Sequence, residues 1–210
     1  MEYNKLLINY INKCNYDEPI FLSQIKDYFN IKYNINSKSI NVYINRLVHN
    51  NKLVQFKKGV YYKPKNGNFG YKILDVNKVI NKKYICDENG RKGYFSGAYL
   101  FNIVGLTTQI PKKILIVTNE CPNNNDYDNK TLGVVIRKPK ISINNSNYKY
   151  FQLFDILINK DNIKIEVDNE KEIIYKFIKE NNLDFEIIFE LAYKLKNIKI
   201  VNKLYQLGGK

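Results

Sequence analysis

Hydrophobic residues recur at helical spacing along the first part of the chain. The apolar side of the first predicted helix consists of Tyr3, Leu6, Leu7, Tyr10, Ile11 and Cys14. We expect this helix to end near Asn15 and the chain to turn at Pro19. Ser23 then stands where an N-cap belongs, ahead of a second helix that carries Ile25, Tyr28 and Phe29.

The third predicted helix, over residues 37–51, has two sides of different chemistry. Asn36 and Ser37 are candidate caps, and the buried stripe consists of Ile40, Ile44, Leu47 and Val48. The same helical wheel turns outward Lys38, Ser39, Val42, Asn45, Arg46 and His49, with Asn41 and Tyr43 on the flanks. This helix therefore packs on a core with one side and offers polar groups on the other.

Two short β-like runs, LVQF and VYYK, follow this helix and are joined by Lys57, Lys58 and Gly59. Such a pair of runs around a glycine predicts a hairpin. Three short helices followed by a hairpin with a basic turn predict a winged helix-turn-helix over residues 1–66. The Gly- and Asn-rich segment 64–71 is typical of a linker, which places a second domain at residues 71–210.

The second domain combines short β runs with a helical C-terminus. We expect a helix over residues 73–82 and a short apolar helix between Gly97 and Gly105. The β-branched runs ILIVT, TLGVVIR and ISI predict a small sheet. The last third has helical periodicity, with apolar positions such as Phe151, Phe154, Phe177 and Ile188. The predicted fold class is α+β: an N-terminal winged helix followed by a mixed α/β domain with a helical C-terminus.

Charge adds a candidate partner to this picture. The 34 Lys and Arg residues exceed the 20 Asp and Glu residues, for a net charge of +14. No acidic residue stands between Asp27 and Asp75, while nine basic residues do: Lys32, Lys38, Arg46, Lys52, Lys57, Lys58, Lys63, Lys65 and Lys72. A one-signed segment of this kind is typical of a phosphate-binding surface. An AT-rich genome that favours Lys codons is the alternative, and it explains the lysines but not the missing acids.

The outward side of the third helix suits the major groove of double-stranded DNA. Asn41 and Asn45 are the candidates for reading base edges, and Val42 for contact with a thymine methyl. Lys38, Ser39, Tyr43 and Arg46 lie on or beside the same face, while Lys57 and Lys58 would hold phosphates without reading sequence. A winged helix used only for protein contact is the alternative.

A resemblance to a known family rests on the run FSGAYLFNIVGLTTQIP. It is similar to the signature SG-x-Y-x-x-N-x-x-G-L-S/T-T-Q-x-P of AbiEi-like antitoxins of type IV toxin–antitoxin systems. The matching residues are Ser96, Gly97, Tyr99, Asn102, Gly105, Leu106, Thr107, Thr108, Gln109 and Pro111. The segment INRLVHNNKLVQFKKGVYYKP also resembles the family's helix-plus-wing pattern, so the two matches span about residues 37–118. Asn51 replaces the family's helix-ending glycine, and Gln55, Lys57 and Lys58 replace its wing arginines.

The resemblance implies an antitoxin that also represses its own operon by binding promoter DNA. It implies a nucleotidyltransferase-like toxin as functional partner and leaves direct contact with that toxin open. A winged-helix regulator without a toxin partner is the alternative. Within the signature we expect structural roles: Gly97 and Gly105 would let a short helix pack and turn, and Asn102 and Gln109 would satisfy buried backbone groups.

Other chemistries find little support in the sequence. Cys14, Cys86 and Cys121 are too dispersed for a disulfide framework or a zinc site, and His49 is the single histidine. The nearest candidates for a nuclease site are Asp155, Glu166, Asp168 and Lys171, but the Glu-x-Lys spacing of such a site is missing. Asp126 and Asp128 lack the glycine and distal glutamate of a calcium loop. We therefore expect no enzyme activity, cofactor or metal, no membrane segment, and a cytoplasmic location.

Overall fold

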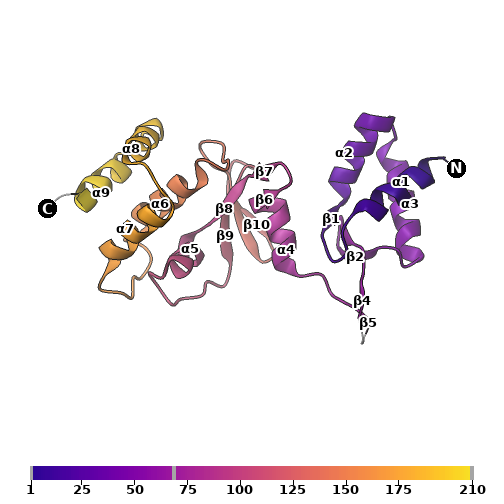
Figure 1. Cartoon of the computed structure of the whole chain (residues 1–210), viewed down its shortest axis with the longest axis horizontal. Coiled ribbons are helices and arrows are strands. Elements are labelled where there is room, and N and C mark those ends of the chain that lie inside the picture. Colours follow the sequence, from indigo (N-terminus) through magenta and orange to yellow (C-terminus); the bar gives the residue numbers. More distant parts are fainter. Residues whose placement is uncertain (1, 68–69, 209–210) are drawn as a thin grey trace. The chain divides into compact units, whose positions relative to one another are not determined.

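The computed structural model describes residues 2–67 and 70–208. The chain divides into two compact units, Met1–Lys82 and Lys83–Lys210, and each buries a hydrophobic cluster. Helices and small β-sheets occur in both units (Figure 1), so the fold class is α+β. No helix within the described ranges has the length and apolar character that crossing a membrane requires.

The first unit begins with a group of three helices and a three-stranded antiparallel sheet. Its helices are α1 (Glu2–Lys13), α2 (Leu22–Tyr33) and α3 (Ser37–His49). The sheet has the order β1-β3-β2 and is formed by β1 (Ile20–Phe21), β2 (Val54–Lys57) and β3 (Val60–Tyr62). The pairing of β2 with β3 confirms the predicted hairpin. Two short strands and one more helix follow: β4 (Asn66–Gly67), β5 (Gly70–Tyr71) and α4 (Val76–Ile80).

The start of α2 differs from the prediction. The helix begins at Leu22, so Ser23 lies inside its first turn, and the residue at the N-cap is Phe21, whose side chain makes no capping bond. Phe21 belongs to β1 and pairs with Val60 of β3. Because the chain passes directly from a paired strand into the helix, sheet pairing sets the helix start in place of a polar cap. On α1, Tyr3 was predicted to lie on the apolar side of the helix, but the residue is 49% exposed.

The second unit contains a mixed sheet with the order β10-β11-β9-β8. Its strands are β8 (Gly93–Ser96), β9 (Ile114–Thr118), β10 (Tyr127–Asn129) and β11 (Val134–Arg137). Strand β9 runs parallel to β11, while the outer strands are antiparallel to their neighbours. A separate two-stranded ribbon consists of β6 (Cys86–Asp87) and β7 (Gly90–Arg91). The runs ILIVT and TLGVVIR thus supply the two central strands, as predicted.

The helices of the second unit largely follow the predicted periodicity. They are α5 (Gly97–Val104), α6 (Tyr148–Asn159), α7 (Glu170–Glu180), α8 (Phe185–Lys194) and α9 (Ile198–Gly208). Helix α6 is the most deeply buried, and its apolar residues join the core cluster of this unit. The helix predicted over 73–82 is shorter: α4 covers Val76–Ile80, and a π-helical turn, η1 (Asn81–Ile85), continues from it.

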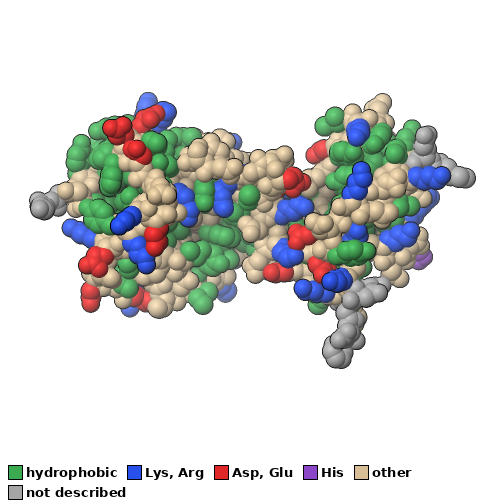
Figure 2. Space-filling model, viewed as in Figure 1, with side chains coloured by type: hydrophobic (Ala, Val, Ile, Leu, Met, Phe, Trp, Pro, Cys, Tyr) green, Lys and Arg blue, Asp and Glu red, His purple; other side chains and the backbone are tan. Residues whose placement is uncertain are grey.

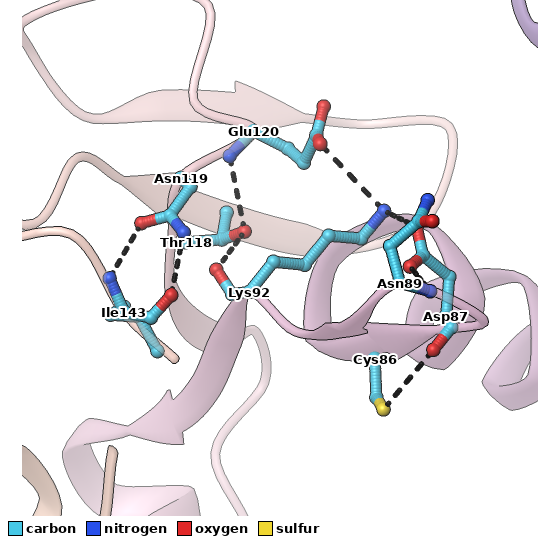
Figure 3. Close-up of polar contacts among 8 residues, drawn as sticks. All are labelled: Cys86, Asp87, Asn89, Lys92, Thr118, Asn119, Glu120 and Ile143. Carbon is cyan, nitrogen blue, oxygen red and sulfur yellow. Dashed lines mark hydrogen bonds and ion pairs between the residues drawn. The ribbon is translucent and has the colours of Figure 1, made fainter. Parts of the chain in front are cut away.

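The run ISI at residues 141–143 is not a strand, which corrects the prediction. The side-chain amide of Asn119 donates to the carbonyl of Ile143 at 2.8 Å, and the amide of Ile143 donates back to Asn119 Oδ1 at 2.9 Å (Figure 3). A side chain therefore satisfies the backbone groups that a strand neighbour would otherwise pair.

A partly buried ion pair braces the same region (Figure 3). Lys92 Nζ lies 2.6 Å from a carboxylate oxygen of Asp87, with side chains only 14% and 7% exposed, and 3.7 Å from Glu120. The backbone carbonyl of Lys92 also accepts from the hydroxyl of Thr118 at 3.0 Å. These contacts tie the β6–β7 ribbon to the end of β9.

Replacing Lys92 with methionine should destabilise the protein, because the carboxylate of Asp87 would stay covered without its cation. We expect a loss of about 2–4 kcal/mol in the free energy of unfolding, measured by urea denaturation. Lys113→Met is the matched control, since Lys113 pairs with Asp128 at 2.5 Å but the side chains are 44% and 38% exposed. That control should lose at most about 1 kcal/mol. Equal losses in the two variants would contradict a bracing role for Lys92.

Candidate nucleic-acid interface

Helix α3 is positioned by a cap at its start and by three buried side chains. The side-chain oxygen of Asn36 accepts from the backbone amide of Lys38 at 2.6 Å, which confirms the predicted N-cap. Ile40, Ile44 and Leu47 are at most 4% exposed and belong to the core cluster of the first unit. The cap fixes where the helix begins, and the buried stripe fixes which side of it faces outward.

The outward side of α3 carries the residues that the helical wheel assigns to it. Exposed are Lys38, Ser39, Val42, Asn45, Arg46 and His49. Asn41 and Tyr43 are partly buried, in keeping with their predicted place on the flanks. The guanidinium of Arg46 lies 5.6 Å from the centre of the Tyr43 ring, a cation–π contact that restricts where its charge can point.

Asn41 and Asn45 differ in what they can offer to a base. Asn41 Oδ1 is buried and has no hydrogen-bond partner among the described residues, whereas Asn45 is exposed. Reading adenine through a bidentate amide requires both the oxygen and the nitrogen of the side chain. Asn45 therefore meets the requirement as it stands, and Asn41 does so only after its side chain turns.

A shallow depression of about 440 Å³ adjoins the second half of this helix face. Val42, Asn45 and Arg46 line it together with Asn4 and Ile8 of α1. No local sequence pattern indicates that α1 shares this surface, because the depression brings together residues about forty positions apart. Lys38 and Ser39, in the first turn of α3, are exposed and do not line the depression.

The hairpin supplies two further exposed cations. Lys57 ends β2 and Lys58 stands in the turn before Gly59, whose φ of 77° is in the left-handed region. A glycine there allows the tight turn that keeps both lysines exposed. The register of the hairpin shifts between Gln55 and Lys57.

Most of the positive charge of this surface is uncompensated. Within the described residues, Lys38, Arg46, Lys57 and Lys58 form no ion pair with a carboxylate. Figure 2 shows Lys and Arg side chains together with several Asp and Glu side chains on the visible side of this unit. Lys63 has a different role, since its ammonium group donates to the carbonyls of Asn12 at 3.1 Å and Cys14 at 2.9 Å, at the end of α1. The acid-free segment between Asp27 and Asp75 thus contains cations without a carboxylate partner and also Lys63, whose ammonium group stabilises the fold.

The signature segment lies in the second unit, where it forms the end of β8, all of α5 and the loop after it. Ser96 donates from its hydroxyl to the carboxylate of Asp155. Gly97 is the first residue of α5 and Gly105 follows its last residue, with φ of 60° and 86°. The rings of Tyr99 and Phe95 pack edge to face. Asn102 donates to the carbonyl of Thr107 at 3.3 Å, Leu106 is fully buried, Pro111 is partly buried, and Gln109 is exposed.

Glu166 holds the loop of the signature, a contact that the sequence did not reveal. Its carboxylate accepts from the amide and hydroxyl of Thr108 at 2.7 and 2.6 Å and from the hydroxyl of Thr107 at 3.2 Å. Its backbone amide donates to the carbonyl of Leu106 at 3.0 Å. The hydrogen bonds from Thr108 lower the pKa of Glu166 to about 2. The loop is thereby fastened to a residue about sixty positions further along the chain.

Two of the candidate nuclease carboxylates have separate partners. Asp155 accepts from Ser96, and Glu166 accepts from Thr107 and Thr108. Across residues 2–67 and 70–208, no three His, Cys, Asp or Glu side chains are grouped so that they could hold a metal ion. Asp126 and Asp128 pair with Arg137 and Lys113.

Comparison with known protein families places this chain in one of them. The model of a family described as a family of unknown function (DUF6088) matches residues 14–182, a stretch that runs from the end of α1 to the end of α7 and includes α3, the hairpin and the signature segment. No curated protein matches the chain.

The contacts of Glu166 predict a pH dependence of stability. Its pKa in the folded state, about 2, lies below its ordinary value of 4.5. Ionised Glu166 therefore stabilises the fold above about pH 5, and this contribution is lost as the pH falls from about 5 towards 2. In urea denaturation at several pH values, the stability difference between the wild type and Glu166→Gln should be constant from pH 7 to 5 and shrink below that range.

Thr108→Val removes one of the donors and should weaken the same pH dependence in part. A stability difference between the wild type and Glu166→Gln that persists unchanged at about pH 3 would contradict this assignment.

Proposed function

We propose that this chain, which belongs to the DUF6088 family, is a DNA-binding repressor of its own operon and an antitoxin of a type IV toxin–antitoxin system. The observation that carries the DNA-binding part is the outward face of α3, which exposes Lys38, Asn45 and Arg46. Neither of the two cations pairs with a carboxylate among the described residues. A phosphate backbone attracts such a surface, and exposed amides can read base edges.

The proposal includes a winged helix-turn-helix as the form of the first unit. Three helices are followed by the β2–β3 hairpin, and β1 completes the sheet on the far side of β3. In this arrangement α3 is the recognition helix and the hairpin is the wing. The first turns of α3 would enter the major groove, and Lys57 and Lys58 would contact phosphates beside it.

The antitoxin part of the proposal rests on the resemblance of the signature segment to AbiEi-like proteins. In this chain the segment is held by Ser96–Asp155 and Thr108–Glu166, so the resemblance falls on a well-supported part of the second unit. The toxin would be a nucleotidyltransferase-like protein, with direct contact left open. The second candidate is a winged-helix regulator without a toxin partner, and the same α3 surface supports it.

The DNA-binding proposal predicts two distinct kinds of loss. Asn45→Ala should reduce the preference for the native upstream duplex over a scrambled one by about 1–3 kcal/mol, because it removes base reading. Lys57→Gln and Lys58→Gln should weaken binding to both duplexes alike and each reduce the salt slope by about 1, because they remove phosphate contacts. Fluorescence anisotropy across a salt series measures both quantities.

Lys194→Gln is the matched control, an exposed lysine on α8 of the second unit that should leave both quantities unchanged. Equal loss on both duplexes for Asn45→Ala would refute the recognition-helix assignment. Absence of binding to any duplex would favour a protein-contact role for the first unit.

The antitoxin part predicts growth rescue. Expression of a nucleotidyltransferase-like reading frame adjacent to the gene for this chain should arrest growth, and co-expression of the chain from an unrelated promoter should restore it. The double variant Lys57→Gln/Lys58→Gln should still rescue, because rescue is assigned to the second unit. Absence of such a reading frame, or arrest that the chain does not relieve, would favour the regulator without a toxin.

A further inference from the structure

A cavity of about 200 Å³ lies inside the second unit. Its walls come from the sheet, from α6, from the loop after β11 and from the turn between α8 and α9, and they include Val117, Phe151, Phe154 and Ile158. An apolar cavity of about 150 Å³ is enough to take up benzene. This one therefore has room for a ring of that size or somewhat larger.

Two polar groups that are largely covered by the fold belong to the lining of the cavity. Tyr94 of β8 and Asp155 of α6 both line it. Ser96 donates to Asp155 from outside the lining, and Arg137, also in the lining, adds a favourable charge. A carboxylate has about four acceptor positions, so the donors around Asp155 leave capacity for a donor on a ligand.

The titration behaviour of these groups agrees with a site shielded from water. Burial raises the pKa of Asp155, against the hydrogen bonds from Ser96 and Tyr94 and the charge of Arg137. Burial and the neighbouring Asp155 raise the pKa of Tyr94 well above its usual range, so its hydroxyl remains a donor. The carboxyl group of Asp155 is thus held in a site shielded from water, where hydrogen bonds from Ser96 and Tyr94 offset part of its burial cost.

The rim of the cavity is cationic. Lys138 and Lys140, on either side of Pro139, contribute to the lining and are exposed. Arg137 is committed to a two-bond contact with Asp126, whereas Lys138 donates only to the neutral amide of Asn124. Within the described part of the chain, neither lysine forms an ion pair. Two ammonium groups are thus available to an anion at the opening.

We propose that this cavity binds a small heteroaromatic anion. Its ring lies among Phe151, Phe154 and Ile158, a ring N–H donates to Asp155, and its anionic group lies against Lys138 and Lys140. Two sources share this chemistry, a purine nucleotide and an aromatic carboxylic acid such as an indole acid. The apolar walls supply burial, Asp155 supplies selectivity for a donor, and the lysines select charge. The site belongs to the second unit alone and does not depend on DNA binding.

Isothermal titration calorimetry of the full chain, without DNA, tests the proposal. The probes are guanosine 5′-monophosphate, indole-3-acetate, indole and inorganic phosphate. We expect saturable binding of guanosine 5′-monophosphate, of indole-3-acetate or of both. Indole lacks the anionic group and phosphate lacks the ring, so each should bind more weakly. Tighter binding of the nucleotide or of the indole acid identifies the source.

Variants locate the site. Lys138→Gln/Lys140→Gln should weaken binding about three- to tenfold and flatten its salt dependence. Asp155→Asn should weaken it about tenfold, with folding checked by thermal denaturation. Lys176→Gln/Lys179→Gln on α7, two exposed lysines away from the lining, is the matched control and should bind as the wild type does. Because the two lysine pairs are exposed, both variants should fold.

Absence of binding by both anions at millimolar concentration would overturn the proposal, as would equal affinity of the wild type and Lys138→Gln/Lys140→Gln. If the full chain binds one of the anions but no DNA duplex, the proposed DNA-binding function is refuted while the proposal for this cavity is retained.

Discussion

The burial of one side of α3 is the constraint on which the first unit depends. Ile40 and Ile44 are 2% and 0% exposed, and burying an aliphatic side chain contributes about 1.5–3 kcal/mol. Turning the helix by one position would expose these groups and bring charged side chains against the core. The same apolar contacts that stabilise the unit therefore decide that Lys38, Asn45 and Arg46 face outward.

Helix α6 has the corresponding position in the second unit, with an added consequence. Its apolar residues Phe151, Leu153, Phe154 and Leu157 join the core, and Asp155 lies among them in sequence. A carboxyl group at this place on a buried helix needs partners, and Ser96 at the start of α5 supplies one. The signature segment is thus connected to α6 through Ser96 and to the chain before α7 through Glu166.

Net charge alone does not show which cations are available to a partner. Lys63 is tied to backbone carbonyls at the end of α1, and Lys92 is held by Asp87 and Glu120. Lys57, Lys58, Lys138 and Lys140 form no ion pair within the described residues. The first group serves the fold, and the second is left without a carboxylate partner, which is why we propose that it meets anions of two kinds, a polymer at the first unit and a small molecule at the second.

Features that depend on neighbours along the chain can be predicted from the amino-acid sequence alone. The cap at Asn36, the two sides of α3 and the β2–β3 hairpin all follow from spacing within about fifteen residues, and the exposed face of α3 could be predicted residue by residue. Three other features become visible only in the folded chain: Phe21 rather than Ser23 precedes α2, Asn119 replaces a strand partner for Ile143, and Glu166 holds Thr108. Folding also brings Tyr94, Asp155 and Lys140 to one cavity. These contacts join residues far apart in the chain, and the free energy that selects them comes from packing and pairing that no local pattern encodes.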